Sequence, residues 1–497
     1  MGDIVLAIDA GTTSIRCIAF GPNGVVIHTS QYPLTQYYPE PGWVEQDAEE
    51  ILDLCIRCVR DCVDAIGASH ISALAITNQR ETTIVWDKVS GRPVYRAIVW
   101  QDRRTQERCE DLKVSDIAEY VFDVTGLYPD AYFSASKLEW ILRSDDRISE
   151  GARCGDLLFG TVDSWILWNI SSGNVHATDC TNASRTMLFD IRKMGWDDGL
   201  LREFDIPPSM LPRVMDSDSC FGMTDSDKLG MSVPISAIMG DQQSALFGQG
   251  CLNEGDIKIT FGTGGFLLMN TGSVPSSANI GLLTTVAWGM DDTIEYAIEG
   301  SVYVAGAAVQ WLRDELGIIE DSADSEELAC SVCDNGGCYV VPAFTGLGAP
   351  YWDQGAKGAI LGITRGTNRA HIARAVLESL AFQANDVVRS MESGSNVHVR
   401  SIKVDGGACR NNFLCQFLAD VTGLTVLRPE CIESTAYGVA RMAAMTTDSW
   451  GPMDRRDDAW NLGRSFEPML SEDVRAAMVS RWHHAVACAR MWSSQDR

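Results

Sequence analysis

Two short turns rich in glycine and threonine could bind phosphate groups. The first, Gly11–Thr13, follows the β-rich run Ile4–Asp9, and the second, Gly262–Gly265, follows the run Asp256–Phe261. A tight turn without bulky side chains lets backbone N–H groups approach phosphate oxygens, and threonine hydroxyls add further donors. One such turn alone is a common hairpin. Two of them, about half the chain apart and each between strand-like runs, predict a duplicated architecture.

Two charged residues beside the first turn fit the same chemistry. Asp9 ends the first strand, and a carboxylate there could hold a Mg²⁺ ion that accompanies the phosphates, often through water. Arg16 could donate a charge-assisted hydrogen bond to a phosphate oxygen. Each also fits a plainer interpretation: Asp9 as a turn-forming residue, and Arg16 as a surface residue on an alternating strand.

A third glycine-rich stretch, Gly406–Ala408, follows the strand-like run Ser401–Asp405. Asn411 or Asn412 then caps a helix. This strand end and the two turns together resemble the ATP-binding apparatus shared by actin, hexokinase and Hsp70, which has two phosphate hairpins and an adenosine loop. Asp241 stands before an apolar helical stretch, so by itself it fits a helix N-cap.

The order of the predicted elements determines how these turns are positioned. Three strands precede a helix that starts at Asp47 and ends at Gly67, with Asp47 and Glu50 as a capping pair, and a strand follows over Ile71–Thr77. Two further helices are predicted over about residues 370–391 and 471–492. We expect an α/β chain of two lobes, residues 1–250 and 251–497, with mixed sheets and a ligand cleft between them.

Composition excludes several classes of function. Lys+Arg 40 against Asp+Glu 67 gives a net charge of −27, which argues against nucleic acid or an anionic membrane as the main partner. Apolar runs are all shorter than the roughly 18 residues of a membrane span, and the N-terminus lacks signal-peptide features. The last residues, 494–497, do not form a peroxisomal address. We therefore expect a cytoplasmic protein.

The chain has 16 cysteines, which we interpret as core or incidental thiols. Cys55, Cys58 and Cys62 fall at helical spacing on one apolar face. Cys330 and Cys333 have no second Cys or His pair at zinc-site spacing. Neither disulfides nor a zinc site are therefore expected.

Longer motifs indicate which family of proteins the chain resembles. The stretches that carry the resemblance are Tyr38–Glu45, Thr77–Thr83, Thr181–Thr186, Gly240–Gln249 and Phe344–Trp352. They resemble the FGGY family of carbohydrate kinases, and within it the glycerol kinases, in the same order along nearly the whole chain. The resemblance implies a two-lobed actin-like ATPase fold of ribonuclease H type, with the catalytic cleft between the lobes. It also implies phosphorylation of glycerol by Mg-ATP to sn-glycerol 3-phosphate in glycerol catabolism, with ATP and glycerol as partners.

The resemblance assigns site residues position by position. Asp241 would be the general base. The glycerol ligands would be Arg80, Glu81, Tyr132, Asp241 and Gln242, with Trp100 and Phe266 flanking the carbon chain. The ATP contacts would be Thr12, Thr13, Ser14, Arg16, Thr263, Gly306, Gln310, Gly407 and Asn411. Residues 1–250 would thus carry the glycerol and phosphate site, and residues 251–497 the adenosine site.

The chemistry of a small triol agrees with these assignments. Its hydroxyls call for charged acceptors and multidentate donors, which Glu81 and Arg80 supply. The two residues are adjacent and would point to opposite sides of a regular strand, but they lie just past a strand end, where a turn can aim both inward. An aromatic wall would cover the C–H face of the substrate. Trp100 could instead be a core residue.

Two alternatives stay open. Another FGGY kinase, acting on a pentulose, would keep the ATP elements but should lack the Asn78–Glu81 motif. A non-metabolic ATPase of actin type should lack the whole triol set. The sequence leaves a dimer or a tetramer open.

The chain departs from the family in two places. Many bacterial glycerol kinases bind fructose 1,6-bisphosphate, an inhibitor, through a Gly- and basic-rich loop. The corresponding stretch here, Met223–Met231, has two acids and one lysine, so we expect no such inhibition. Ala10 replaces a polar residue of many relatives and removes one potential contact.

Overall fold

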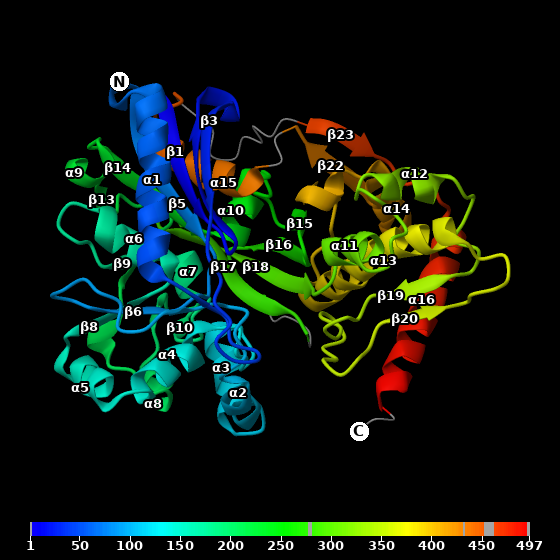
Figure 1. The fold of residues 1–497 in the computed structure, drawn as a ribbon, viewed down its shortest axis with the longest axis horizontal. Helices are drawn as coiled ribbons and strands as arrows, with labels where there is room; N and C mark the ends of the chain where they lie inside the picture. The colour runs from blue at the N-terminus through cyan, green and yellow to red at the C-terminus, as the bar shows by residue number, and fades with distance from the viewer. Residues whose placement is uncertain (1, 277–280, 431–432, 452–461, 495–497) are drawn as a thin grey trace.

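The structure, a computed structural model, describes residues 2–276, 281–430, 433–451 and 462–494. Two mixed β-sheets form its centre (Figure 1). The six-stranded sheet of the first half has the order β13 (Gly222–Met223), β14 (Pro234–Gly240), β5 (Ile71–Asn78), β1 (Ile4–Ala10), β2 (Ser14–Phe20), β3 (Val26–Pro33). The seven-stranded sheet of the second half has the order β17 (Leu283–Met290), β18 (Thr293–Val302), β16 (Gly265–Gly272), β15 (Ile257–Phe261), β21 (Ser401–Asp405), β22 (Thr425–Pro429), β23 (Leu462–Phe466).

The two sheets repeat one pairing pattern, which confirms the predicted duplication. In the first, β1 pairs antiparallel with β2 and parallel with β5, which pairs parallel with β14. In the second, β15 pairs antiparallel with β16 and parallel with β21, which pairs parallel with β22. The β1–β2 and β15–β16 hairpins are the two predicted glycine-threonine turns. The prediction of an α/β chain with two mixed sheets is confirmed.

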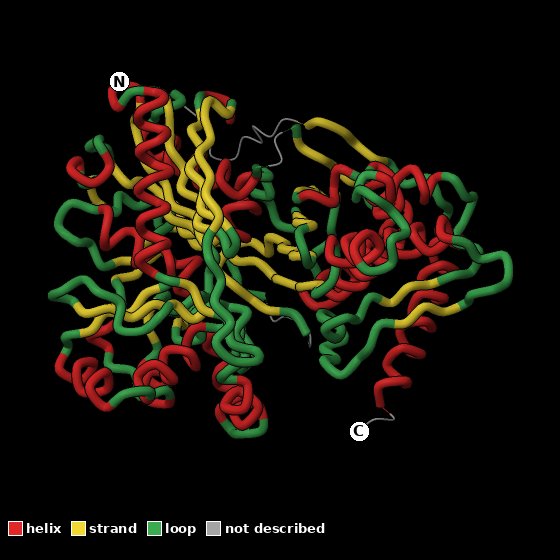
Figure 2. The backbone as a smooth tube through the Cα atoms, viewed as in Figure 1, coloured by secondary structure: helices red, strands yellow, loops and turns green. Residues whose placement is uncertain are grey.

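Helices cover both sheets (Figure 2). The helices used in the argument below are α1 (Ala48–Ile66), α10 (Asp241–Gly248), α13 (Arg369–Ser395), α14 (Asn412–Thr422), α15 (Ser434–Thr447) and α16 (Glu472–Ser494). Helix α1 packs on β1, β2 and β3, whereas α15, from the second half of the chain, packs on β1, β5 and β14. Figure 1 shows α15 in orange beside α10, so a helix of the second half covers part of the first sheet.

The remaining helices and strands connect these parts. In the first half they are η1 (Pro22–Gly24), β4 (Glu45–Gln46), η2 (Ala68–His70), β6 (Ile84–Asp87), β7 (Ala97–Ile98), α2 (Gln106–Lys113), α3 (Ile117–Thr125), α4 (Ser134–Arg143), α5 (Asp146–Cys154), β8 (Leu157–Gly160), α6 (Val162–Ile170), β9 (Ala177–Asp179), α7 (Cys180–Ala183), β10 (Phe189–Asp190), β11 (Gly195–Trp196), α8 (Asp198–Glu203), η3 (Pro208–Met210), β12 (Arg213–Met215) and α9 (Ser226–Leu229). In the second half they are α11 (Gly306–Asp314), α12 (Asp324–Cys330), β19 (Tyr339–Val341), β20 (Ala359–Leu361) and η4 (Gly407–Arg410).

The N-terminus of α1 confirms one capping residue and corrects the other. The Asp47 carboxylate accepts hydrogen bonds from the backbone N–H groups of Glu49 and Glu50 at 2.9 and 3.4 Å. The Glu50 carboxylate instead accepts from the N–H and the hydroxyl of Thr35. A tertiary contact therefore takes the side chain that the sequence pattern assigns to a capping box. Gly67 ends the helix as predicted.

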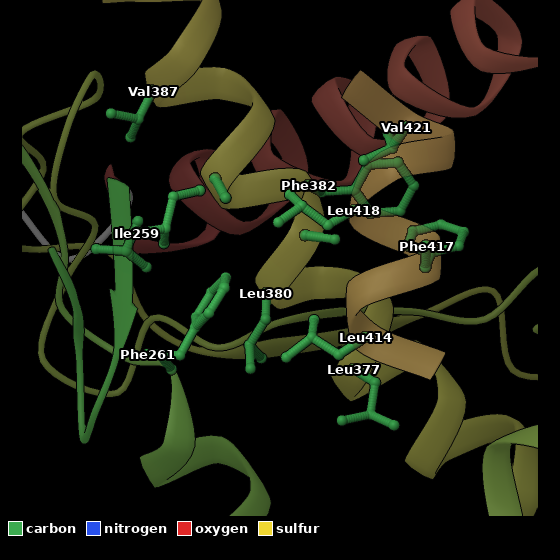
Figure 3. Close-up of a cluster of buried hydrophobic side chains, with 14 of the residues drawn as sticks. Ile259, Phe261, Leu377, Leu380, Phe382, Val387, Leu414, Phe417, Leu418 and Val421 are labelled. Carbon is green, nitrogen blue, oxygen red and sulfur yellow. The ribbon is translucent and has the colours of Figure 1, made fainter. Parts of the chain in front are cut away.

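The second lobe has a core between its sheet and two helices. Figure 3 shows Ile259 and Phe261 of β15 on the side of α13 that carries Leu380, whereas Phe382 of α13 lies toward Phe417 of α14. Fully burying each such side chain contributes roughly 1.5–3 kcal/mol. This packing holds the second hairpin and the start of α14 in fixed positions beside each other.

The cysteines of the described residues are free thiols, and Cys55, Cys58 and Cys62 are buried on the inner face of α1 as predicted. Within the described ranges, no helix is long and apolar enough to cross a membrane.

Candidate active site

Three segments of the first lobe converge at the carboxyl ends of parallel strands. Asn78, the last residue of β5, lies in register with Ala10 of β1 on one side and Gly240 of β14 on the other. The first hairpin, the pair Arg80–Glu81 and Asp241 therefore all begin at the same sheet edge. In open α/β sheets this edge is where ligands bind.

Arg80 is the most highly connected side chain at this edge. It is buried, and its Nη1 donates to Glu299 Oε2 at 2.7 Å and to Gln243 Oε1 at 3.1 Å. Its Nη2 donates to Glu299 Oε1 at 3.1 Å, and its Nε lies 3.1 Å from Asp241 Oδ1. The guanidinium group is therefore fixed from three sides, with one edge toward Asp241.

Glu81 points into the same cluster, as the position of this pair past the strand end predicted. Its Oε1 accepts a hydrogen bond from Arg185 Nε at 2.9 Å and lies 3.7 Å from Arg80 Nε. Burial raises the pKa of Glu81 above its ordinary value, and the two arginines act against that shift. Arg185 and Glu299 were missed as individual site residues. Arg185 lies within the Thr181–Thr186 motif, whereas for Glu299 the only sequence signal is an acid inside an apolar strand.

Asp241 is the first residue of α10, and its side chain keeps 30% of its surface exposed. The N-cap position belongs to Gly240, so the interpretation of Asp241 as an N-cap is wrong. Gln242 donates to the Asp241 carboxylate from its backbone N–H at 2.7 Å and from Nε2 at 3.3 Å. Burial raises the pKa of Asp241, while Arg80 and the Gln242 hydrogen bonds lower it. A partly exposed carboxylate held by these donors can accept a proton from a substrate hydroxyl.

Gln242 connects this edge to the second lobe. Its Oε1 accepts a hydrogen bond of 2.5 Å from Nζ of Lys258, a buried residue of β15 that also donates to Thr260 Oγ1. Burial lowers the pKa of Lys258 to about 8, against the opposing effect of Asp405 and Asp241. Lys258 is a further residue that sequence reasoning missed, because its position inside a strand gave no signal.

Three aromatic side chains from separate segments form one wall. The ring of Trp100 meets those of Tyr132 and Phe266 edge-on, at centroid distances of 5.5 and 6.5 Å. All three are half-buried, so Trp100 is not a core residue. Trp100 Nε1 donates to Thr12 Oγ1 at 2.9 Å, which attaches the wall to the first hairpin.

A separate cavity of about 470 Å³ opens in the second lobe. All five predicted ATP contacts of this lobe line it: Thr263, Gly306, Gln310, Gly407 and Asn411. Asn411 also caps α14 by accepting from the backbone N–H of Leu414 at 3.0 Å. Ser325, Glu326 and Arg410 line the cavity as well and were not predicted.

The predicted ATP contacts of the first hairpin lie apart from the residues that line this cavity. Thr13 is exposed and Thr12 and Ser14 are half-buried at the turn between β1 and β2. Arg16 is paired with Asp9 and, at 2.7 Å, with Glu433 Oε2. The Arg16 guanidinium is therefore bound to two carboxylates and is not available to a phosphate group unless one of these contacts breaks.

The oxygen donors at the sheet edge fit a Mg²⁺ ion. Mg²⁺ prefers oxygen ligands and is commonly bound by one or two carboxylates together with substrate phosphates. Asp9 supplies such a carboxylate at the end of β1, beside the first hairpin. Its pKa is raised by burial, and Arg16 opposes that shift. Among the described residues, no three His, Cys, Asp or Glu side chains form a metal site, so phosphate and water oxygens would complete the coordination.

Comparisons with known proteins agree with this geometry. A model of the N-terminal domain of the FGGY family of carbohydrate kinases matches residues 4–248, and a model of its C-terminal domain matches residues 257–447. Glycerol kinases of Agathobacter rectalis and Symbiobacterium thermophilum are 51% and 50% identical, with coverage of 100% and 99% of both chains. A crystal structure of Plasmodium falciparum glycerol kinase with ADP has a TM-score of 0.93 at 32% identity and covers 98% of each chain. The chain belongs to the FGGY family of carbohydrate kinases, and within that family it is similar to glycerol kinases.

Proposed function

We propose that this enzyme transfers the terminal phosphoryl group of ATP to a terminal hydroxyl of glycerol, giving sn-glycerol 3-phosphate and ADP. The observation that carries the proposal is the convergence of Arg80, Glu81 and Asp241 beside the wall of Trp100, Tyr132 and Phe266. Charged groups on one side and aromatic rings on the other match the hydroxyls and the C–H face of a short polyol. The relatives named above support glycerol as that polyol.

Each residue of the set has a role in this proposal. Arg80 donates to the glycerol hydroxyls, and Glu81 and Gln242 bind them as well. The aromatic wall covers the carbon chain and helps to exclude water from the reacting oxygen. Asp241 accepts the proton of the attacking hydroxyl, a role that contributes roughly 10²–10⁴-fold in rate.

The two glycine-threonine hairpins would hold the ATP phosphates, with Thr12, Thr13, Ser14 and Thr263 as donors. The cavity lined by Gly306, Gln310, Gly407 and Asn411 would take the adenosine part. Mg²⁺, when bound near Asp9, would neutralise charge on the transferred phosphoryl group. Arg16 would exchange one of its carboxylate partners for a phosphate oxygen when ATP binds.

Three broader features belong to the same proposal. Residues 1–250 and 251–497 would be the two domains, supported by the family matches that end at residue 248 and begin at residue 257. The enzyme would work in the cytoplasm, where ATP is abundant, and would be a homo-oligomer. Phe266 and Glu299 lie in the second half, so both halves contribute to the polyol site.

A coupled assay of ADP release with Mg-ATP tests the proposal. Release should depend on glycerol and should be weak with xylulose or ribulose. Release with a pentulose in place of glycerol would assign the chain to another acceptor within the family. Release without any acceptor would contradict the kinase proposal.

A further inference from the structure

Glu299 occupies an unusual position for a charged residue. It lies inside strand β18 of the second sheet, its side chain is 1% exposed, and its direct neighbours in the strand are Ile298 and Gly300. Buried carboxylates are rare unless they are paired. Here the pairing partners, Arg80 and Arg185, both come from the first half of the chain.

The first partner is Arg80, whose guanidinium Glu299 binds with both carboxylate oxygens, at 2.7 and 3.1 Å. Bidentate pairing of this kind fixes the plane of the guanidinium group as well as its position. The hydrogen bonds to Glu299 and Gln243 use both N–H groups of Nη1 and one of Nη2. The second N–H of Nη2 is not used by these hydrogen bonds, and Nε faces the Asp241 carboxylate at 3.1 Å.

The second partner is Arg185, whose Nη2 donates to Glu299 Oε1 at 3.1 Å. Its Nε donates to Glu81 at 2.9 Å, so Arg185 bridges Glu299 and Glu81. The Nη1 atom of Arg185 is buried and has no hydrogen-bond acceptor among the described residues. Buried donors are nearly always satisfied, so this nitrogen indicates that a substrate oxygen or an ordered water belongs beside it.

Glu299 carries its charge in this environment. Burial alone would raise its pKa, but Arg185 and Arg80 outweigh burial and lower the pKa to about 2. Loss of that charge would leave the two buried guanidinium groups with Glu81, which lies near both, and with Asp241, which lies 3.1 Å from Arg80 Nε.

We propose that Glu299 is a positioning residue of the polyol site: through Arg80 and Arg185 it fixes the two groups, the Arg80 guanidinium and the Glu81 carboxylate, that bind the substrate hydroxyls. This inference rests on the proposed function above. It adds that β18, a strand of the second lobe, orients substrate-binding groups that lie in the first lobe. Glu299 itself touches its two arginines and does not need to touch the substrate.

The test is Glu299→Gln, which keeps the size and shape of the side chain but removes the charge and turns one acceptor into a donor that faces an N–H group. We expect the KM for glycerol to rise roughly tenfold to hundredfold, the effect of losing a hydrogen bond to a charged group. The KM for ATP should change less than about twofold, because the cavity of the second lobe does not include Glu299 or its partners.

The matched control is Glu139→Gln. Glu139 is 3% exposed and also pairs with two arginines, Arg108 and Arg143, but it lies on α4 outside the polyol cluster. The Glu139→Gln variant should lose less stability than Glu299→Gln, because Arg108 and Arg143 are 32% and 63% exposed, and it should leave the KM for glycerol unchanged. A glycerol KM raised equally in both variants would reduce Glu299 to a structural residue and contradict the proposal.

A second variant, Glu299→Asp, covers the case in which the glutamine variant does not fold. It keeps the charge but shortens the side chain by one methylene, so that it can no longer reach both arginines. The KM for glycerol should again rise, by less than in Glu299→Gln. A glycerol KM within twofold of wild type in either folded variant would overturn the inference, whereas the absence of glycerol-dependent ADP release in wild type would overturn the proposed function itself.

Discussion

Asp241 is the residue on which the proposed chemistry depends most directly. Its carboxylate is partly exposed, while Arg80 and Gln242 hold it from the buried side. Asp241→Asn keeps the size of the side chain but cannot accept a proton, so we expect kcat to fall roughly 10²–10⁴-fold with the fold intact. Single-turnover ADP release measures this, and Asp145→Asn at the exposed start of α5 is the control. Turnover close to wild type would refute the assignment of Asp241 as base.

A second prediction at this scale concerns pH and stability. Burial raises the pKa of Asp163 to about 7, against hydrogen bonds from Thr161 and Thr178. The folded state therefore binds a proton that the unfolded chain releases at about pH 4, and stability falls as pH rises through this window. The loss is on the order of 4 kcal/mol, at about 1.4 kcal/mol per pH unit.

Asp163→Asn removes this titration. The Tm of the variant relative to wild type should increase from about pH 4 to about pH 7 and stay level above pH 7, because wild type loses its buried proton over this range. Thermal unfolding followed by fluorescence across this range measures the difference. A difference that stays constant with pH would show that Asp163 ionises normally in the folded protein.

At the scale of elements, the crossing of α10 and α15 depends on glycine. A Cβ atom added to Gly438 of α15 would lie 1.8 Å from the backbone oxygen of Ser244, and one added to Gly248 would lie 2.2 Å from that of Ser434. Only residues without a Cβ allow these two helices to approach so closely. The contact matters for the site, because α10 begins with Asp241.

Gly438→Ala should therefore force the helices apart. We expect a loss of about 1–3 kcal/mol or more in the free energy of unfolding, together with reduced kcat, since α10 would move with the base at its start. Gly195→Ala is the control, since a Cβ there meets nothing within 4 Å. Chemical denaturation and ADP release measure the two effects. Wild-type stability in Gly438→Ala would contradict the packing described here.

At the scale of the whole molecule, charge limits which effectors can bind. The net charge of the chain is −27. The stretch Met223–Met231 starts at the end of β13 and contains the short helix α9, whose N-cap is the Asp225 carboxylate. The single lysine of this stretch, Lys228, already donates to the backbone oxygen of Asn169. A sugar bisphosphate would meet two carboxylates in this stretch against a single ammonium group that is already hydrogen-bonded.

Fructose 1,6-bisphosphate should therefore leave the activity unchanged. Titration of the bisphosphate into the glycerol-dependent assay measures this at low and at physiological salt, because screening weakens repulsion between exposed charges. Inhibition at micromolar concentration would contradict the prediction and would require cations from outside the Met223–Met231 stretch.

Local patterns explain how much of the fold could be predicted. The hairpins at Gly11 and Gly262 and the start of α1 follow from turn chemistry, apolar periodicity and capping, which act over a few residues. The contact of Glu50 with Thr35, in place of the predicted capping role, could not be predicted in this way, because Thr35 lies close only after β3 and α1 have packed. The packing of α15 on the first sheet could not be predicted from local patterns either, because these elements are hundreds of residues apart in the sequence.

The sequence by itself determined the two-lobed α/β architecture, the phosphate hairpins and the residue types Arg80, Glu81 and Asp241 that fit a polyol. Only the tertiary structure showed that Glu299, Arg185 and Lys258 join this set. The physical reason is that a charged residue inside an apolar strand gives no local sign of its partners. Glu299 is tolerated in a buried strand because folding brings two arginines of the other half within hydrogen-bond distance of it.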